Sequence, residues 1–197
     1  MAGASVSPQA CGCEREDVSG GTAGHDVDAR VAQLLAKQDI LELSVRYMRA
    51  LDRLDAPLQL SVFHDDATTD YGFFRGTAQA FVAFAQQALA GHLANHHLIG
   101  QALIVVDGEH AVGEVYFHAF HRIVVAGAEQ DLIIAGRYLD RYERRAGVWK
   151  ISYRSEVNDW ARSSPAADEW LRQTPTSIRG ARGEADPSHA LLRGLIP

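Results

Sequence analysis

The chain has 197 residues, enough for one domain with a sizeable core and two tails. Its net charge of -6 and the lack of a basic stripe argue against nucleic-acid binding, and no segment approaches the roughly 18 apolar residues of a membrane span. The first 28 residues contain neither the basic start nor the apolar stretch of a secretory signal, so we expect a cytoplasmic protein.

The two ends of the chain differ in composition from its middle. Residues 1–28 are polar, aperiodic and rich in Gly and Ser, which predicts a disordered leader. This leader holds two cysteines, Cys11 and Cys13, without further ligands at metal-binding spacing. We expect the domain to span residues 29–162, and a C-terminal extension, residues 163–197, to pack on the domain or on a neighbouring subunit. The extension is too apolar for a purely solvated segment, since it contains Trp170, Leu171, Leu191, Leu192, Leu195 and Ile196.

Three helices are predicted in the first half of the domain. The first runs from Asp28, its N-cap, to Leu51. A short helix runs from Pro57 to Phe63, and a third spans 78–90 before a glycine. Two apolar stripes at helical spacing form the face of the first helix that we expect to be buried. The stripes are Val31, Leu34, Leu35, Leu41, Val45 and Met48, and Ile40, Leu43, Tyr47 and Leu51.

The second half of the domain has the period of strands. Residues 97–106 are apolar on both faces, which is typical of a central strand covered on two sides. An Asp-Gly pair and an Ala-Gly pair predict two hairpins. Helices followed by an antiparallel meander are typical of an α+β fold whose curved sheet wraps around the first helix. The expected strands are 66–72, 97–106, 111–125, 132–144 and 148–160, followed by a short helix at 166–171.

A carboxylate and an imidazole are the first candidate site residues. One turn beyond Met48, the apolar stripe reaches Asp52, and burying an unpaired charge costs several kcal/mol, so this carboxylate needs a partner. The adjacent His96 and His97 point to opposite faces of their strand, so one should point inward. An inward Asp–His pair is a general base. The structural alternative is that Asp52 caps the helix end or pairs with Arg53 in solvent.

Other polar residues have weaker cases. Tyr47 lies about 140° around an ideal helix from Asp52, so the two could flank one cavity without stacking. A metal site at the adjacent histidines is disfavoured because neighbours on a strand cannot easily converge on one ion. His118 and His121 fall on opposite faces of the next strand, and we expect them to be structural or exposed.

A series of short motifs occurs in a characteristic order. They are LDRLD at 51–55, FHDDA at 63–67, NHHLIG at 95–100, VDG at 106–108, AVGEVY at 111–116, GRYLDRYER at 136–144 and GVWKI at 147–151. Together they resemble the SnoaL-like branch of the NTF2 superfamily over about residues 28–162. The resemblance implies a cone-shaped α+β barrel, in which a curved antiparallel sheet wraps around about three N-terminal helices, and a homodimer or homotrimer.

The resemblance also assigns roles to individual residues. The dehydrochlorinase and bile-acid dehydratase of this superfamily carry a catalytic Asp that matches Asp52 and a catalytic His that matches His97. The dehydratase has a Tyr that matches Tyr47, where the dehydrochlorinase has Lys, and an Arg on the last strand matches Arg154. The dehydrochlorinase's pocket Trp has no counterpart near Thr69, so we do not expect the same substrate.

Arg154 is also the residue on which two arguments disagree. Strict alternation puts it on the polar face of the last strand, opposite Trp149 and Ile151, and binary patterning assigns such a face to solvent. The resemblance instead turns this face into the cone.

The leading hypothesis is a cofactor-independent lyase acting on a hydrophobic aromatic or polycyclic small molecule, as a dehydratase or as a formaldehyde-releasing lyase of lignin-derived diarylpropanes. His97, oriented by Asp52, would remove a proton, and Tyr47 or Arg154 would stabilise negative charge or protonate the leaving group. No nucleotide or flavin motif occurs, so we expect no cofactor and no metal. The expected substrate-binding residues are Phe73, Phe74, Phe84, Tyr116, Tyr138 and Asn158.

Two alternatives stay open because the fold alone settles no function. An isomerase or cyclase, of the ketosteroid-isomerase or polyketide-cyclase type, would use the same pair to move a proton without expelling a group. A non-catalytic binding or scaffold subunit, like the small subunit of a dioxygenase, would keep Asp52 and His97 as a buried structural pair.

Overall fold

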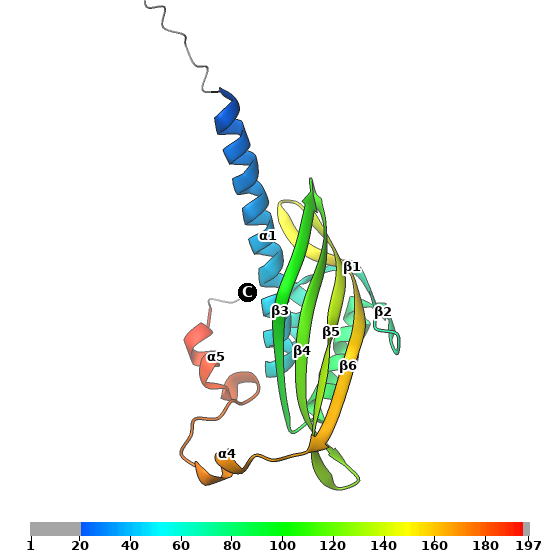
Figure 1. Ribbon diagram of the computed structural model, residues 1–197, viewed down its shortest axis with the longest axis vertical. Helices are drawn as coiled ribbons and strands as arrows, with labels where there is room; N and C mark the ends of the chain where they lie inside the picture. Colours follow the sequence, from blue (N-terminus) through cyan, green and yellow to red (C-terminus); the bar gives the residue numbers. More distant parts are fainter. Residues whose placement is uncertain (1–20, 195–197) are drawn as a thin grey trace, which may run out of the picture.

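A long N-terminal helix and a six-stranded sheet form the molecule, and the computed structural model describes residues 21–194 (Figure 1). The helices before the sheet are α1 (Gly21–Arg53), α2 (Ala56–Ser61) and α3 (Ala78–Ala90). The strands are β1 (Phe63–Asp70), β2 (Arg75–Thr77), β3 (Ala94–Asp107), β4 (His110–Val125), β5 (Ala128–Arg145) and β6 (Val148–Pro165). The C-terminal extension contains α4 (Glu169–Gln173), the 3₁₀ helix η1 (Gly183–Ala185) and α5 (Pro187–Leu192).

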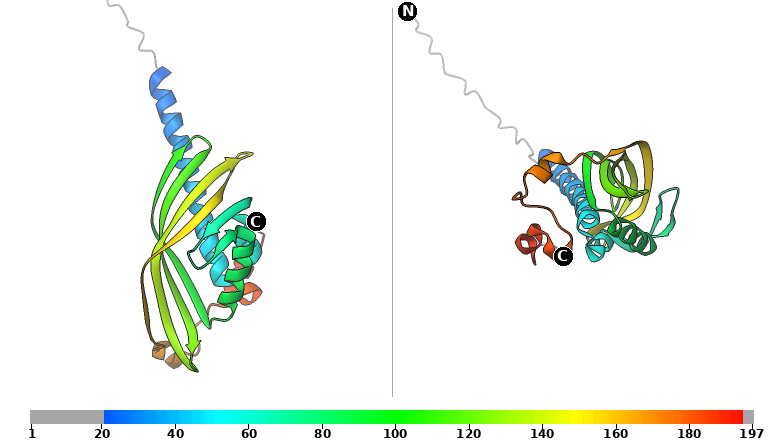
Figure 2. Two further views of the ribbon diagram at one scale, coloured as in Figure 1. Left: turned by 90° about the vertical axis from the view of Figure 1, so that its right-hand side faces the viewer. Right: turned by 90° about the horizontal axis from the view of Figure 1, so that it is seen from below.

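The sheet is curved and open, and the three N-terminal helices lie against its concave face (Figure 2). Its strand order is β2-β1-β6-β5-β4-β3. All neighbouring strands are antiparallel except β1 and β6, which are parallel. The α+β class and the curved sheet are therefore as predicted. The cone is not closed, because β2 and β3 form free edges.

Strand β3 is an edge strand, which corrects the prediction of a central strand covered on both faces. Its inward side chains, among them His97 and Ile104, are buried against α1, whereas Leu98, Leu103 and Val105 on the outer face are exposed. Within residues 21–194 no element covers that outer face. The apolar residues on both faces of β3 are therefore not all buried within the chain, because those on its outer face are exposed.

Glycine-containing turns join the long strands of the meander. Gly108 lies between β3 and β4 with a φ of 58°, and Gly147 lies between β5 and β6 with a φ of 80°. Both predicted hairpins are therefore present, and a third, through Ala126 and Gly127, joins β4 to β5. Positive φ at both central residues, as at Ala126 and Gly127, matches the right-handed twist of the flanking strands.

Helix α1 differs from the predicted helix in its start and in its buried face. It begins at Gly21, so Asp28 lies inside the helix and is not its N-cap, and residues 21–28 are helical instead of a disordered leader. Residues 1–20, with both cysteines, lie outside the described residues. No helix within residues 21–194 is both long and apolar enough to cross a membrane.

Only one of the two apolar stripes of α1 forms the core. The stripe of Ile40, Leu43, Tyr47 and Leu51 is buried. The other stripe was expected to be buried too, but the N-terminal turns of α1 extend past the end of the sheet (Figure 1), and most of the stripe is exposed. Its exposed members are Val31, Leu34, Leu35 and Val45, and Met48 is buried.

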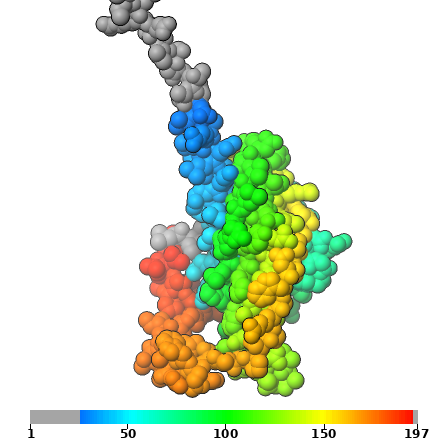
Figure 3. Space-filling model, in the orientation of Figure 1, coloured from blue at the N-terminus to red at the C-terminus, as the bar shows by residue number. Residues whose placement is uncertain are grey.

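The C-terminal extension packs beside the C-terminal half of α1 (Figure 3). Arg182 donates to the backbone carbonyls of Ala90 and His92, and Arg122 of β4 pairs with Asp168 at 2.6 Å. The extension contacts the rest of the chain through these polar groups. Trp170 and Leu191 remain exposed. Leu195 and Ile196 lie outside the described residues.

Candidate active site

A cavity of about 340 Å³ lies between helices α1 and α3 and the concave face of the sheet. Aromatic and aliphatic side chains form most of its wall. The ionisable groups that reach it are Tyr47, Tyr71, Tyr138, His92, His97, His121 and Glu156. No lysine or arginine among the described residues lines it. The cavity therefore suits a neutral, hydrophobic molecule with a few polar groups.

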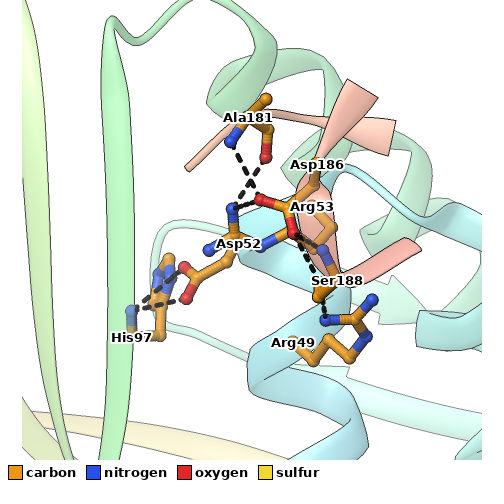
Figure 4. Close-up of polar contacts among 7 residues, drawn as sticks. All are labelled: Arg49, Asp52, Arg53, His97, Ala181, Asp186 and Ser188. Atoms are coloured by element: carbon orange, nitrogen blue, oxygen red, sulfur yellow. Dashed lines mark hydrogen bonds and ion pairs between the residues drawn. The ribbon is translucent and has the colours of Figure 1, made fainter. Parts of the chain in front are cut away.

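Asp52 and His97 contact each other between α1 and β3 (Figure 4), and His97 lines the cavity. Asp52 is the penultimate residue of α1 and His97 is an inward residue of β3, and both are buried. The His97 ring Nδ1 lies 2.7 Å from Asp52 Oδ1, and the backbone N–H of His97 donates to both carboxylate oxygens, at 3.0 and 3.2 Å. The predicted inward pair is confirmed, with His96 exposed.

The geometry of the pair fixes the tautomer of the imidazole. An ionised carboxylate only accepts hydrogen bonds, so Nδ1 of His97 carries the hydrogen and Nε2 keeps a lone pair. His97 lines the cavity and Asp52 lies behind it. The ring therefore presents a base to the cavity while the carboxylate holds it from the opposite side.

A second histidine, His121 of β4, is buried beside the first. The rings of His97 and His121 are 5.0 Å apart, and Asn95 Oδ1 accepts from Nδ1 of His121 at 3.1 Å and of His92 at 2.8 Å. Burial, and then the nearby charges of His97 and His92, lower the pKa of His121 to about 3, so it is neutral at neutral pH. We expected His121 to be structural or exposed, and did not predict that it lines the cavity.

The alternation of inward-pointing residues along β4 could have predicted that His121 faces the cavity. Val115, Phe117 and Ala119 are apolar, alternate along the strand and are all buried, and the same alternation continues to His121.

Two tyrosines supply hydroxyl groups to the cavity. Tyr47 of α1 and Tyr71, just after β1, share a hydrogen bond of 2.8 Å between their hydroxyl oxygens. Burial raises the pKa of Tyr47, against the opposing charge of Arg154, and raises that of Tyr71 well above its usual value. Both hydroxyls are therefore protonated donors at neutral pH. Tyr71, which stacks on Phe81 with ring centres 3.8 Å apart, was not predicted as a site residue.

Arg154 faces the interior of the domain but does not line the cavity. Its guanidinium makes two hydrogen bonds to Asp140, at 2.8 and 2.7 Å, and lies 4.3 and 4.1 Å from the ring centres of Tyr47 and Tyr138. Burial disfavours its charge, but Asp140 outweighs this and holds the pKa of Arg154 well above its usual value. Arg154 can therefore act on the cavity only through the tyrosines.

A bulge explains why binary patterning misplaced Arg154. Tyr142 pairs with Ile151 and Arg141 with Tyr153, so Ser152 is an extra residue in β6. One extra residue reverses the side to which the following residues point. Trp149 and Ile151 are buried before the bulge, and Arg154, Glu156 and Asn158 turn inward after it.

Glu156 is the acidic group of the cavity wall. Burial raises its pKa to about 7, while a hydrogen bond from Asn158 and the charge of Arg154 oppose the shift less strongly. The carboxyl group is therefore partly protonated at neutral pH. We did not predict Glu156 as a site residue, because the bulge that turns it inward cannot be seen in the alternation.

Four of the six expected substrate-binding residues line the cavity. These are Phe73, Phe84, Tyr138 and Asn158. Phe74 lies behind the wall, packed on Phe81 and Phe84 with ring centres 5.3 Å away in each case. Tyr116 points to the outer face of β4, near the Arg137 guanidinium, and its neighbour Phe117 lines the cavity instead. Successive residues of a strand point to opposite faces, which accounts for this error.

No group of three or more His, Cys, Asp or Glu side chains within residues 21–194 is arranged to hold a metal ion. The three histidines of the cavity bind Asp52 and Asn95 with their Nδ1 atoms. The arrangement is therefore one of proton-transfer groups around an apolar space.

Comparisons with known proteins identify the domain family and its fold. Residues 32–155 match the SnoaL-like domain. A hexachlorocyclohexane dehydrochlorinase from Novosphingobium barchaimii LL02 has 20% identity and a TM-score of 0.62, over 71% of this chain and 95% of that one. A scytalone dehydratase candidate from Novosphingobium aromaticivorans has 19% identity and a TM-score of 0.60, over 68% and 91%.

A protein of unknown function from Mycobacterium tuberculosis has 25% identity and a TM-score of 0.53, over 64% of this chain and 77% of that one. The search of curated proteins found no match. At these identities the likeness to solved structures concerns the fold.

Proposed function

Since the chain belongs to the SnoaL-like domain family, we propose that its cavity catalyses a cofactor-independent elimination on a hydrophobic small molecule. The observation that carries the proposal is the Asp52–His97 pair, whose free Nε2 faces a cavity with mainly apolar walls. A neutral imidazole with its tautomer fixed by a carboxylate is a general base.

In this proposal each polar group of the cavity has a separate task. His97 removes a proton from carbon, and Asp52 stabilises the imidazolium that forms. One hydroxyl of the hydrogen-bonded Tyr47–Tyr71 pair donates to the other, and the second keeps its hydrogen free for the substrate oxygen on which negative charge develops. Arg154 is a positioning residue, because its guanidinium holds the Tyr47 and Tyr138 rings without reaching the cavity.

The walls favour an aromatic or polycyclic substrate. Phe73, Phe84 and Phe117 offer ring faces and edges, and Phe117 and Tyr138 are stacked with centres 4.7 Å apart. The dehydrochlorinase and the dehydratase candidate among the structural neighbours make elimination the favoured reaction class. We propose that the molecule eliminated is either water or formaldehyde.

The test is a panel of aromatic and polycyclic hydroxylated compounds, with each mixture read by mass spectrometry for loss of a small molecule. The wild-type protein should convert at least one compound without added metal or cofactor. His97→Ala and Asp52→Asn should abolish most of that conversion. His118→Ala is the matched control, because His118 is exposed on the outer face of the same sheet.

If His97→Ala converts the compound as fast as the wild type and the control His118→Ala do, the proposal is contradicted. Loss of thermal stability in the two site variants, with no conversion by any form of the protein, would favour a scaffold subunit instead.

A further inference from the structure

Glu156 is a partly buried carboxyl group, and no lysine or arginine among the described residues lines the cavity that it faces. It projects from β6 into the same space as Nε2 of His97. The nearest arginine, Arg154, is two residues earlier on the same strand, but both of its hydrogen-bonding contacts go to Asp140. A carboxyl group in such a place is either neutral or destabilising.

The other groups around Glu156 do not supply a positive charge. Asn158 of the same strand donates a hydrogen bond, and Tyr47 of α1, Tyr71 after β1 and Tyr138 of β5 are close enough for the carboxylate to raise their pKa values. The remaining titratable groups of the cavity are His92, His97 and His121. Burial outweighs these influences and raises the pKa of Glu156 to about 7.

We propose that Glu156 is the proton donor to the leaving group, and that the substrate is a neutral molecule whose hydroxyl group leaves as water. The inference rests on the proposed function, because it needs His97 to begin the elimination. It goes further in naming a second catalytic residue and the class of leaving group.

The proposed step conserves atoms and charge. His97 Nε2 takes a proton from carbon, the electrons of that C–H bond form the new C=C bond, and the C–O bond on the adjacent carbon breaks. The protonated carboxyl group of Glu156 gives its proton to the departing oxygen, so that water is released. The imidazolium of His97 then returns a proton to the carboxylate of Glu156 through that water. No oxidant or reductant is needed.

The chemistry of the leaving group explains why such an acid is useful. Hydroxide is a poor leaving group and leaves readily only when it is protonated, whereas chloride leaves as a stable anion. A protonated carboxyl group is therefore of use for loss of water and of little use for loss of halide. The absence of lysine and arginine from the described lining also disfavours a substrate that carries a carboxylate or phosphate near Glu156.

The first test needs no substrate. Infrared spectra of the full chain should show the carbonyl stretch of a protonated, buried carboxylic acid at slightly acidic pH, and the band should disappear as the pH rises through about 7. The band should be absent from Glu156→Gln and present in Glu114→Gln, a control whose Glu lies on the outer face beside Arg137. A Glu156 carboxylate already ionised at slightly acidic pH would overturn the proposal.

The second test compares two leaving groups on one carbon skeleton. An aryl β-hydroxyketone and its β-chloroketone analogue give the same conjugated enone, which is followed by its absorbance. Glu156→Gln should reduce kcat for the hydroxyketone by roughly 10²-fold or more and that for the chloroketone by less than roughly 10-fold. His97→Ala should reduce both, and Glu114→Gln neither.

The outcomes of this comparison separate the two proposals. Equal losses for both ketones in Glu156→Gln, or a loss for neither, would overturn the role of Glu156 and leave His97 as base. Wild-type activity on the chloroketone alone would overturn the assignment of water as the leaving group. Conversion of neither ketone by the wild-type protein would contradict the proposed elimination itself. The hydroxyketone activity of the wild type should also fall as the pH rises through about 7, and that of Glu156→Gln should not.

Discussion

Asp52 holds His97 through two different groups, the ring Nδ1 at 2.7 Å and the backbone N–H at 3.0 Å. The carboxylate thus fixes the orientation of the imidazole and also the position of the strand that carries it. These contacts join the last turn of α1 to the start of β3. A substitution at Asp52 should therefore affect both the chemistry and the local structure.

The variant Asp52→Asn separates these two effects. An amide of the same shape can still accept one hydrogen bond, but it does not stabilise an imidazolium and disfavours the productive tautomer. We expect kcat to fall by roughly 10²–10⁴-fold with a small change in KM, and the circular-dichroism spectrum to stay unchanged. Wild-type kcat in a folded Asp52→Asn protein would contradict the role of the carboxylate.

Glu156 should make the stability of the protein depend on pH. Its pKa is about 7 in the folded state against an ordinary value of 4.5, so the folded protein keeps this proton over a range in which the unfolded chain has lost it. The free energy of unfolding therefore decreases as the pH rises from about 4.5 to about 7, and this contribution is constant above that.

Glu156→Gln removes this dependence. The variant should be more stable than the wild type at about pH 8, by at most about 3 kcal/mol, and similar to it below about pH 4.5. Urea unfolding at the two pH values measures the difference. A variant that is less stable than the wild type at the higher pH would show that the carboxylate is stabilised in the fold.

His121 should act in the opposite pH window. Its pKa is about 3 in the folded state against an ordinary value of 6.5, so the unfolded chain binds a proton first as the pH falls. Stability contributed by the neutral ring is present above about pH 6.5 and is lost on acidification towards pH 3. His121→Gln should lose less stability than the wild type between these pH values, and the exposed His118→Gln should lose as much as the wild type. Identical acid unfolding of all three proteins would refute this.

Asp186 should anchor the C-terminal extension next to the active site. Its side chain pairs with Arg53 at 2.7 Å and accepts from the backbone N–H of Ala181 and of Ser188 at 2.9 Å in each case, and Ser188 binds Arg49 (Figure 4). Asp186→Ala should lower the free energy of unfolding by about 1–3 kcal/mol, because it removes the acceptor shared by the partly buried Arg53, Ala181 and Ser188 donors.

The same substitution should release the extension. Limited proteolysis of Asp186→Ala should cleave within residues 165–194 faster than it cleaves the wild-type protein. Glu184→Ala, an exposed neighbour in η1, is the control. Equal cleavage rates would show that Asp186 does not hold the extension.

A homo-oligomer remains our prediction for the assembly. The outer face of the sheet exposes Leu98, Leu103, Val105 and Val112, and apolar side chains gathered on one exposed face are typical of an interaction surface. Sedimentation should give a dimer or trimer at micromolar concentration, and Leu103→Lys should shift it towards the monomer. A stable wild-type monomer at that concentration would refute the prediction.

Local patterns predicted the α+β order, two of the three hairpins, and an inward carboxylate and imidazole, and the resemblance to the SnoaL-like family identified these as Asp52 and His97. Each of these depends on short-range information, such as a glycine turn, an apolar stripe continued by one turn, or two neighbouring residues on opposite faces of a strand. The pairing also needed the requirement that a buried carboxylate has a partner.

The errors come from features that such patterns do not contain. The extra residue Ser152 reverses the direction of Arg154 and Glu156, and only the pairing of β5 with β6 reveals it. Two apolar stripes on α1 are equally regular in sequence, and the packing of the sheet decides which one is buried. Tyr116 was predicted to line the cavity, but its neighbour Phe117 does so, because successive residues of β4 point to opposite faces of the sheet.

The most direct test of the central claim is the turnover number of His97→Ala with the compound that the wild-type protein converts fastest. If His97 is the general base, kcat should fall by roughly 10²–10⁴-fold while the thermal unfolding profile stays close to that of the wild type. Added imidazole should restore part of the activity, because the substitution leaves room for it beside Asp52. Full turnover by a well-folded His97→Ala protein, without imidazole, would contradict the account.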